Sequence, residues 1–388
     1  MTGNLKKIII FLLLNVFLVS LLLNFTPVFA DQLSENIDEQ LGNLELGELE
    51  NFFNTIVRKP NDVDFLSYIN GLLHGEYNVD LANVTNYIAN IFLNNVFEVL
   101  PTFLSVIAIA VLCGIIQNTK NSYLSDSVGE ITFFVCMMGI VLLISTQVIS
   151  LWQNTQNIIE NIANLIEIMS PIIITLMVAV GGNVSASVYK PTVAFLSNGV
   201  VNVFLCAVMP LIAMMTIFNL VSNFSSTVKL GKFADFATST IKWIVGLIVT
   251  IFGLFLSVQG ITSAHFDGIS IKAAKYAISN SVPIIGGFLK DGFDLVIAGS
   301  VLIKNVIGIA VIVALFYMVI SPTLYLAVFS LLLKLTAALV EPISDTRIAN
   351  FCVSMSKTIT YLTVVLLSVG FMLFITVLLM IFSANAFI

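Results

Sequence analysis

The chain consists of long apolar runs without a charged side chain, separated by short polar segments. These runs cover residues 99–119, 131–159, 168–189, 191–228, 243–264, 305–333 and 358–388. A helix needs about 20 apolar residues to cross the roughly 30 Å of hydrocarbon in a bilayer, so each run can supply at least one span. The pattern predicts an all-α fold, that of a polytopic helical membrane protein.

Prolines and glycines divide the longest runs. The run 191–228 is nearly twice the length of one span and contains Pro210, and Pro322 occupies a similar place in 305–340. Because proline removes a backbone donor and clashes with the preceding turn, we expect each run to hold two short helices. The count is then about eight to ten transmembrane segments, the lower number applying if proline-initiated segments only re-enter. The expected helix-break positions are Pro171, Gly181, Gly182, Pro210, Pro283, Gly286, Gly287 and Pro322.

Two parts of the chain resemble one another. Two proline pairs share a spacing of 39 residues at an offset of 112, namely Pro171 with Pro210 and Pro283 with Pro322. Farther on, FADFATSTIK at 233–242 matches IANFCVSMSK at 348–357 in Ala, Phe, Ser and Lys, at an offset of 115. A three-residue insertion reconciles the offsets. We therefore expect an internal duplication with membrane repeats at 166–260 and 278–388, chance likeness of apolar segments being the alternative.

The amino-terminal segment has the features of a secretory signal peptide. Lys6 and Lys7 precede an apolar run at 8–23, and small residues precede an expected cleavage after Ala30. Residues 1–30 are therefore expected to be a signal peptide, and a retained anchor is the alternative because the apolar run is slightly long. In either case the basic end stays inside, so the following region lies outside the cytoplasm.

Residues 31–98 form an acidic region, with 12 acidic and 2 basic side chains. Their apolar positions, such as Leu46 and Leu49, follow helical spacing rather than span-length hydrophobicity. We expect short extracytoplasmic amphipathic helices that pack against the membrane bundle or a partner, because so short a region can bury only a marginal core. Two transmembrane helices at 99–165 follow, and an interfacial linker at 261–277 is expected between the repeats.

Composition and charge narrow the function. Hydrophobic residues make up 58% of the 388 residues and charged residues 10%, against about 25% charged in an average soluble protein, which excludes an ordinary water-soluble enzyme. No Lys/Arg cluster exceeds two residues, so no nucleic-acid partner is expected. Neither His-Glu-x-x-His nor Gly-x-Ser-x-Gly occurs, and the four cysteines form no close pair. We therefore expect no enzyme activity, cofactor or metal site.

The most polar stretch of the membrane region begins after Pro283. It contains Lys290, Asp291 and Asp294, and an apolar run then leads to Lys304. A charge at the centre of a bilayer costs about 2.5–3.5 kcal/mol, so these side chains need partners or water. On a helix, Lys290 and Asp294 are four residues apart and can pair. These four residues are candidates for a polar membrane path, and an interfacial helix end with snorkelling charges is an equal alternative.

The segment EPISDTR at 341–347 is a compact charged loop beside an apolar run. Glu341, Asp345 and Arg347 are candidates for docking a cytoplasmic partner, and the alternative is that Asp345 caps the next helix. The positive-inside bias places this loop in the cytoplasm together with Lys120, and it leaves the carboxyl terminus outside.

Several of these motifs together resemble the stage III sporulation protein AE family. The likeness covers nearly the whole chain and is carried by 44–53, 170–187, 282–305 and 341–347. The resemblance implies a component of the complex that bridges the mother cell and the engulfed forespore, in the mother-cell-derived membrane around the forespore. It implies as partners ring-forming subunits, small membrane subunits and a secretion-type ATPase, and it carries over no active site.

Three functional hypotheses follow. In the first, the chain is a non-enzymatic subunit that forms or scaffolds a translocation path within a multiprotein channel, lined by the region 290–304. In the second, it is an independent secondary permease, for which repeats and broken helices are equally expected. In the third, it is a structural anchor that recruits partners through the acidic region and the loop at 341–347. Membrane lipid is a partner in all three.

Overall fold

The computed structural model describes residues 40–42, 44, 46–56, 69, 71–72, 81–118, 126–224, 230–281 and 286–383. Within these ranges the chain forms helices and no strand, so the predicted all-α fold is confirmed. The expected signal peptide, residues 1–30, lies outside the described residues.

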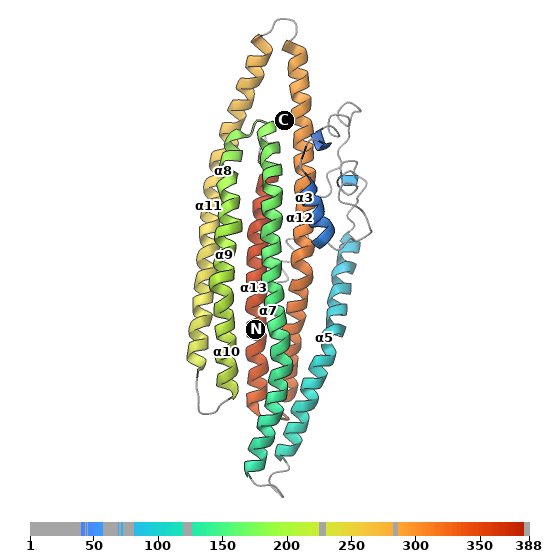
Figure 1. Cartoon of the computed structure of the whole chain (residues 1–388), viewed down its shortest axis with the longest axis vertical. Coiled ribbons are helices and arrows are strands. Elements are labelled where there is room, and N and C mark those ends of the chain that lie inside the picture. Colours follow the sequence, from blue (N-terminus) through green and yellow to red (C-terminus); the bar gives the residue numbers. More distant parts are fainter. Residues whose placement is uncertain are drawn as a thin grey trace.

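The helices form an elongated bundle and run close to its long axis (Figure 1). In chain order they are α3 (Gly47–Ile56), α5 (Leu81–Asn118), α7 (Asp126–Ala179), α8 (Asn183–Ala194), η1 (Phe195–Val200), α9 (Val201–Val203), η2 (Phe204–Val208), α10 (Met209–Phe224), α11 (Gly231–Ser281), α12 (Gly286–Val340) and α13 (Thr346–Phe382). The elements from α8 to α10 make one continuous helical rod, in which η1 and η2 are π-helical turns. The long helices pair as three hairpins, α5 with α7, the α8–α10 rod with α11, and α12 with α13. All three turns lie toward the lower end of Figure 1.

Six helices among the described residues are long and apolar enough to cross a membrane. The multi-pass character is confirmed, but the number is lower than the eight to ten segments expected from the sequence. The difference arises because Pro171 and Pro322 lie inside α7 and α12, and Pro210 is the second residue of α10. The expected helix breaks at these three prolines are therefore not observed.

Local hydrogen bonding explains how these helices tolerate proline. Pro171 cannot donate to the carbonyl of Glu167, and the Ser170 hydroxyl donates to that carbonyl instead, at 3.3 Å. Before Pro210 the rod widens into the π-helical turn η2, which makes room for the proline ring. Hydroxyl side chains and local π adjustments are the usual means by which membrane helices accommodate proline.

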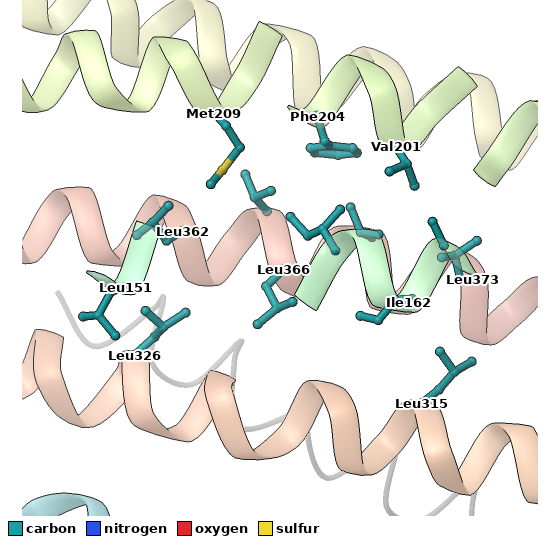
Figure 2. Close-up of a cluster of buried hydrophobic side chains, with 14 of the residues drawn as sticks. Leu151, Ile162, Val201, Phe204, Met209, Leu315, Leu326, Leu362, Leu366 and Leu373 are labelled. Carbon is teal, nitrogen blue, oxygen red and sulfur yellow. The ribbon is translucent and has the colours of Figure 1, made fainter. Parts of the chain in front are cut away.

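The core is a layer of aliphatic side chains between α7, α12, α13 and the α8–α10 rod. In Figure 2, Leu362 and Leu366 of α13 lie between Met209 of α10 and Leu326 of α12, and all four side chains belong to one buried cluster. Most of α12 and α13 is buried, whereas the other four spans keep a broad exposed face. The bundle is therefore organised around the α12/α13 hairpin.

Small and hydroxyl residues bring α12 and α13 close together. Gly308 of α12 and Gly370 of α13 lie where the facing helix leaves no space for a larger residue. Ser330 of α12 is 2.9 Å from the hydroxyl of Ser356 and 3.2 Å from that of Thr360 on α13. Close approach through small residues and interhelical hydroxyl bonds are the interactions that hold helices together in lipid, where the hydrophobic effect contributes little.

The acidic region packs on the bundle through α3. Leu46, Leu49 and Phe52 are buried in the main core cluster, and α3 contacts α7. Gln40 accepts a hydrogen bond from Ser300 of α12 at 2.8 Å. The boundary expected at residue 98 lies inside α5, which begins at Leu81, so this region and the first span share one helix.

The second and third hairpins have corresponding positions in the proposed repeats. Their second helices begin at Gly231 and Thr346, and 346 − 231 gives 115, which is the offset of the polar-segment match. Both hairpins also turn at the same end of the bundle (Figure 1). The expected linker at 261–277 is instead part of α11, which continues to Ser281. The duplication itself stays a prediction.

Candidate functional site

Lys304 is fully buried, with 0% of its surface exposed. Its ammonium group donates to the carbonyl of Ser383, the residue that follows the last turn of α13. The final carbonyls of a helix lack intrahelical donors and carry partial negative charge, so a cation is well placed there. The Ser383 hydroxyl also lies 3.8 Å from the sulfur of Met177 on α7. Lys304 therefore joins the ends of α7 and α13 to α12.

The other members of the expected polar path lie farther along α12. Lys290 and Asp291 belong to its first turns, and their side chains are outside the described set. Asp294 is half-buried, and ten residues of helix, about 15 Å, separate it from Lys304. The structure thus does not bring Lys304 together with Asp294. Pro283 is not among the described residues, and Gly286 and Gly287 are the first residues of α12.

The charged loop at 341–347 is tied to the bundle by its own residues. Asp345 caps α13 by accepting from the Arg347 backbone N–H at 2.9 Å, and Arg347 Nη2 returns to Asp345 Oδ2 at 2.8 Å. The Arg347 guanidinium lies 3.7 Å above the ring of Phe133 on α7. Asp345 and Arg347 therefore fix the turn of the third hairpin, whereas Glu341 is exposed.

Close contact with α5 holds the same loop from the other side. A Cβ atom on Gly114 would approach the carbonyl oxygen of Ile343 to 2.2 Å, so only glycine permits this contact. The exposed residues Glu341, Pro342 and Ile343 remain as the surface that the loop offers to a partner.

The chain turns at Gly181 and Gly182, where α7 ends. Gly181 has a φ of 92°, and the amides of Gly182 and Gly181 donate to the carbonyls of Met177 and Val178. These two bonds make a Schellman motif, which requires a residue that tolerates positive φ. This turn lies at the end of the bundle opposite to the three hairpin turns (Figure 1).

A row of polar side chains that the sequence analysis did not select lies on the outer face of α7 and of the α8–α10 rod. We call it the polar wall, and its exposed members are Asn157, Glu160, Asn164, Glu167, Asn198, Asn202 and Cys206. The amide of Asn198 donates to Glu167 Oε1 at 2.9 Å, and the Trp152 indole donates to the Met209 carbonyl at 3.2 Å. These bonds hold the two antiparallel helices in register.

The sequence signal for the polar wall is its spacing. On α7 its members recur every three or four residues and alternate with buried Ile159, Ile162 and Leu165. That is the pattern of an amphipathic helix, yet the amide-rich composition favoured an external segment between two spans. Among the described residues, no group of three His, Cys, Asp or Glu side chains could hold a metal ion.

Comparison with known proteins agrees with the resemblance drawn from the motifs. The family model for stage III sporulation protein AE matches residues 63–384. The chain is 25% identical over 360 residues to stage III sporulation protein AE of Bacillus subtilis (strain 168), an alignment that covers 92% of this chain and 89% of that protein. No solved structure matches the chain. The chain belongs to the stage III sporulation protein AE family.

Proposed function

We propose that this chain is a non-enzymatic, multi-pass membrane subunit of the channel complex that links mother cell and forespore, where it forms or scaffolds a translocation path. Its place is the mother-cell-derived membrane around the forespore. Its partners are ring-forming subunits, small membrane subunits and a secretion-type ATPase. The observation that carries the proposal is a bundle with six membrane-length helices in a chain matched to the family over residues 63–384.

The charge distribution supports a cytoplasmic position for the three hairpin turns. Lys120 and Lys229 stand in the sequence between the paired helices, Lys232 begins α11, and Arg347 follows the third turn. Positive side chains near span ends favour the cytoplasmic side. The helix α3 and the Gly181 turn are at the opposite end, so they face the space between the two membranes.

The lengths of the helices support a scaffolding role. With 54 residues in α7 and 55 in α12, each helix extends about 80 Å, far more than the roughly 30 Å of hydrocarbon. The excess provides rigid surfaces outside the lipid. Helix α3 buries Leu49 against the bundle and exposes Glu48, so an acidic face is available there to extracytoplasmic partners.

Recovery of partners from sporulating cells tests this proposal. A tagged chain, cross-linked in the membrane and purified, is expected to recover ring-forming subunits and the ATPase. Replacing Leu49 with Glu would detach α3 and is expected to reduce recovery of the extracytoplasmic ring subunits only, whereas the matched surface change Glu48→Gln leaves α3 docked. Recovery of the chain alone, with solute transport by the purified protein in vesicles, would instead support the permease.

A further inference from the structure

The polar wall lies at the same height along the bundle axis as an apolar outer surface. The ring of Phe195 in the rod is 5.9 Å from that of Phe255 on α11, and Asn198, one turn along, bonds to Glu167. Glu167 is therefore level with the α11 segment just before Phe255. In that segment Leu254 is 64% exposed and Ile251 is 45% exposed. One side of the bundle is thus suited to lipid at a height where the other side is polar.

Lipid is an unfavourable environment for the polar wall. A carboxylate in the hydrocarbon costs about 2.5–3.5 kcal/mol, and the wall exposes two, Glu160 and Glu167. The exposed amides of Asn157, Asn164 and Asn202 would lose their hydrogen bonds to water as well. The wall therefore requires water or a polar partner in front of it.

The two π-helical turns keep the rod's share of the wall on one face. Its exposed residues Ala194, Asn198, Asn202, Cys206 and Pro210 are spaced by four. In a regular α-helix each step of four advances by about 40°, so such a series would wind away from α7. The wider turns of η1 and η2 reduce this drift. π-helical turns of this kind are frequent at functional sites.

A dry contact between copies would place like charges together. Copies of a membrane protein with one orientation are related by an axis normal to the bilayer, so each wall residue would face its own equivalent at the same height. Glu160 would oppose Glu160, and Glu167 would oppose Glu167, which disfavours direct packing without water. Water between the copies removes this conflict.

We propose that the polar wall lines a water-filled passage enclosed by copies of this chain, and that its carboxylates favour cations over anions. The inference rests on the proposed function, because it names the surface with which that subunit contributes to a path. It differs from the path expected from the sequence, since Lys304 is sealed inside the bundle.

Cysteine reactivity in purified protein, reconstituted alone in lipid vesicles, tests the proposal. Single cysteines replace Asn157 and Asn164 on the wall and, as controls at lipid-facing positions, Leu247 and Leu254. The background carries Cys206→Ser, which removes the exposed native thiol. Water-soluble, membrane-impermeant thiol reagents of positive and negative charge are compared. Native folding is checked by the elution volume and by the lack of reaction of the buried thiols.

The expected result is reaction at the two wall positions and none at the leucine positions. The positive reagent should react about tenfold faster than the negative one, as charge-lined clefts raise local counter-ion concentration. The double change Glu160→Gln and Glu167→Gln should bring this ratio close to one.

Three results would overturn the proposal. Unreactive wall cysteines would mean a dry contact, and reactive leucine positions would place this height outside the bilayer. Reaction in cells but not in the purified protein would mean that a different protein encloses the wall. Recovery of partners, measured on the same variants, reports separately on the proposed function.

Discussion

Gly308 is the position where α12 and α13 approach most closely, and an added methyl group there should have a large effect. A Cβ atom would lie 2.2 Å from Cγ1 of Ile381, which is 3% exposed. Ordinary carbon contacts are about 3.5–4.0 Å, so the two helices or the Ile381 side chain must shift by about 1.5 Å. Such overpacking costs about 1–3 kcal/mol, against which the better helix propensity of alanine returns at most about 1 kcal/mol.

Gly253 on α11 provides the matched control, because nothing lies within 4 Å of its Cβ position. Gly253→Ala should leave the free energy of unfolding unchanged or raise it slightly, whereas Gly308→Ala should lower it. Titration with a denaturing detergent in mixed micelles measures both. The second variant, Ile381→Ala, removes the clashing atoms and on its own should cost about 2–5 kcal/mol as a cavity.

The double variant decides the matter. If the clash is the cause, Gly308→Ala combined with Ile381→Ala should be less destabilised than the sum of the single changes, by about 1–3 kcal/mol. Additive losses would refute the close packing of α12 on α13, and so would equal behaviour of the Gly308 and Gly253 variants.

Three further predictions concern the loop and the buried lysine. Arg347→Ala should lower stability by about 1 kcal/mol, a modest value because the side chain is 37% exposed, and Arg347→Lys should restore only part of it, as thermal denaturation would show. Gly114→Val should displace Ile343 and make the loop sensitive to protease, whereas Gly139→Val on α7, with its nearest neighbour at 3.9 Å, should not. Lys304→Met keeps the volume and removes a buried charge, so it should be within about 1.5 kcal/mol of the wild type, whereas Lys304→Ala should cost about 2–5 kcal/mol; equal losses would contradict the clamp described above.

The apolar runs were sufficient to predict the membrane bundle, but not the course of the chain through its prolines. Whether a helix ends at Pro210 or continues depends on neighbours that supply packing and hydrogen bonds, such as Ser170 beside Pro171. These neighbours become visible only when the helices are placed together. The number of spans was overestimated for this reason.

The candidate sites show the same limit. Lys304 was selected correctly as unusual, since a charge inside an apolar run needs a partner, but its partner, the carbonyl of Ser383, is a backbone group at the far end of another helix. No sequence pattern identifies such a contact. The polar wall was detectable in principle from its spacing on α7, although its match to Asn198 depends on the antiparallel register set by the Gly181 turn.

The central claim is that three hairpins enter the membrane with the same orientation, and cysteine labelling in intact bacterial cells tests it most directly. Single cysteines at Ser122, Ser225 and Ser344 report on the three turns, and one at Asn183 reports on the opposite end. The account predicts that an impermeant thiol reagent labels only the Asn183 position, and that the other three react only after the membrane is permeabilised. Labelling of any one of the three turns from outside would contradict it.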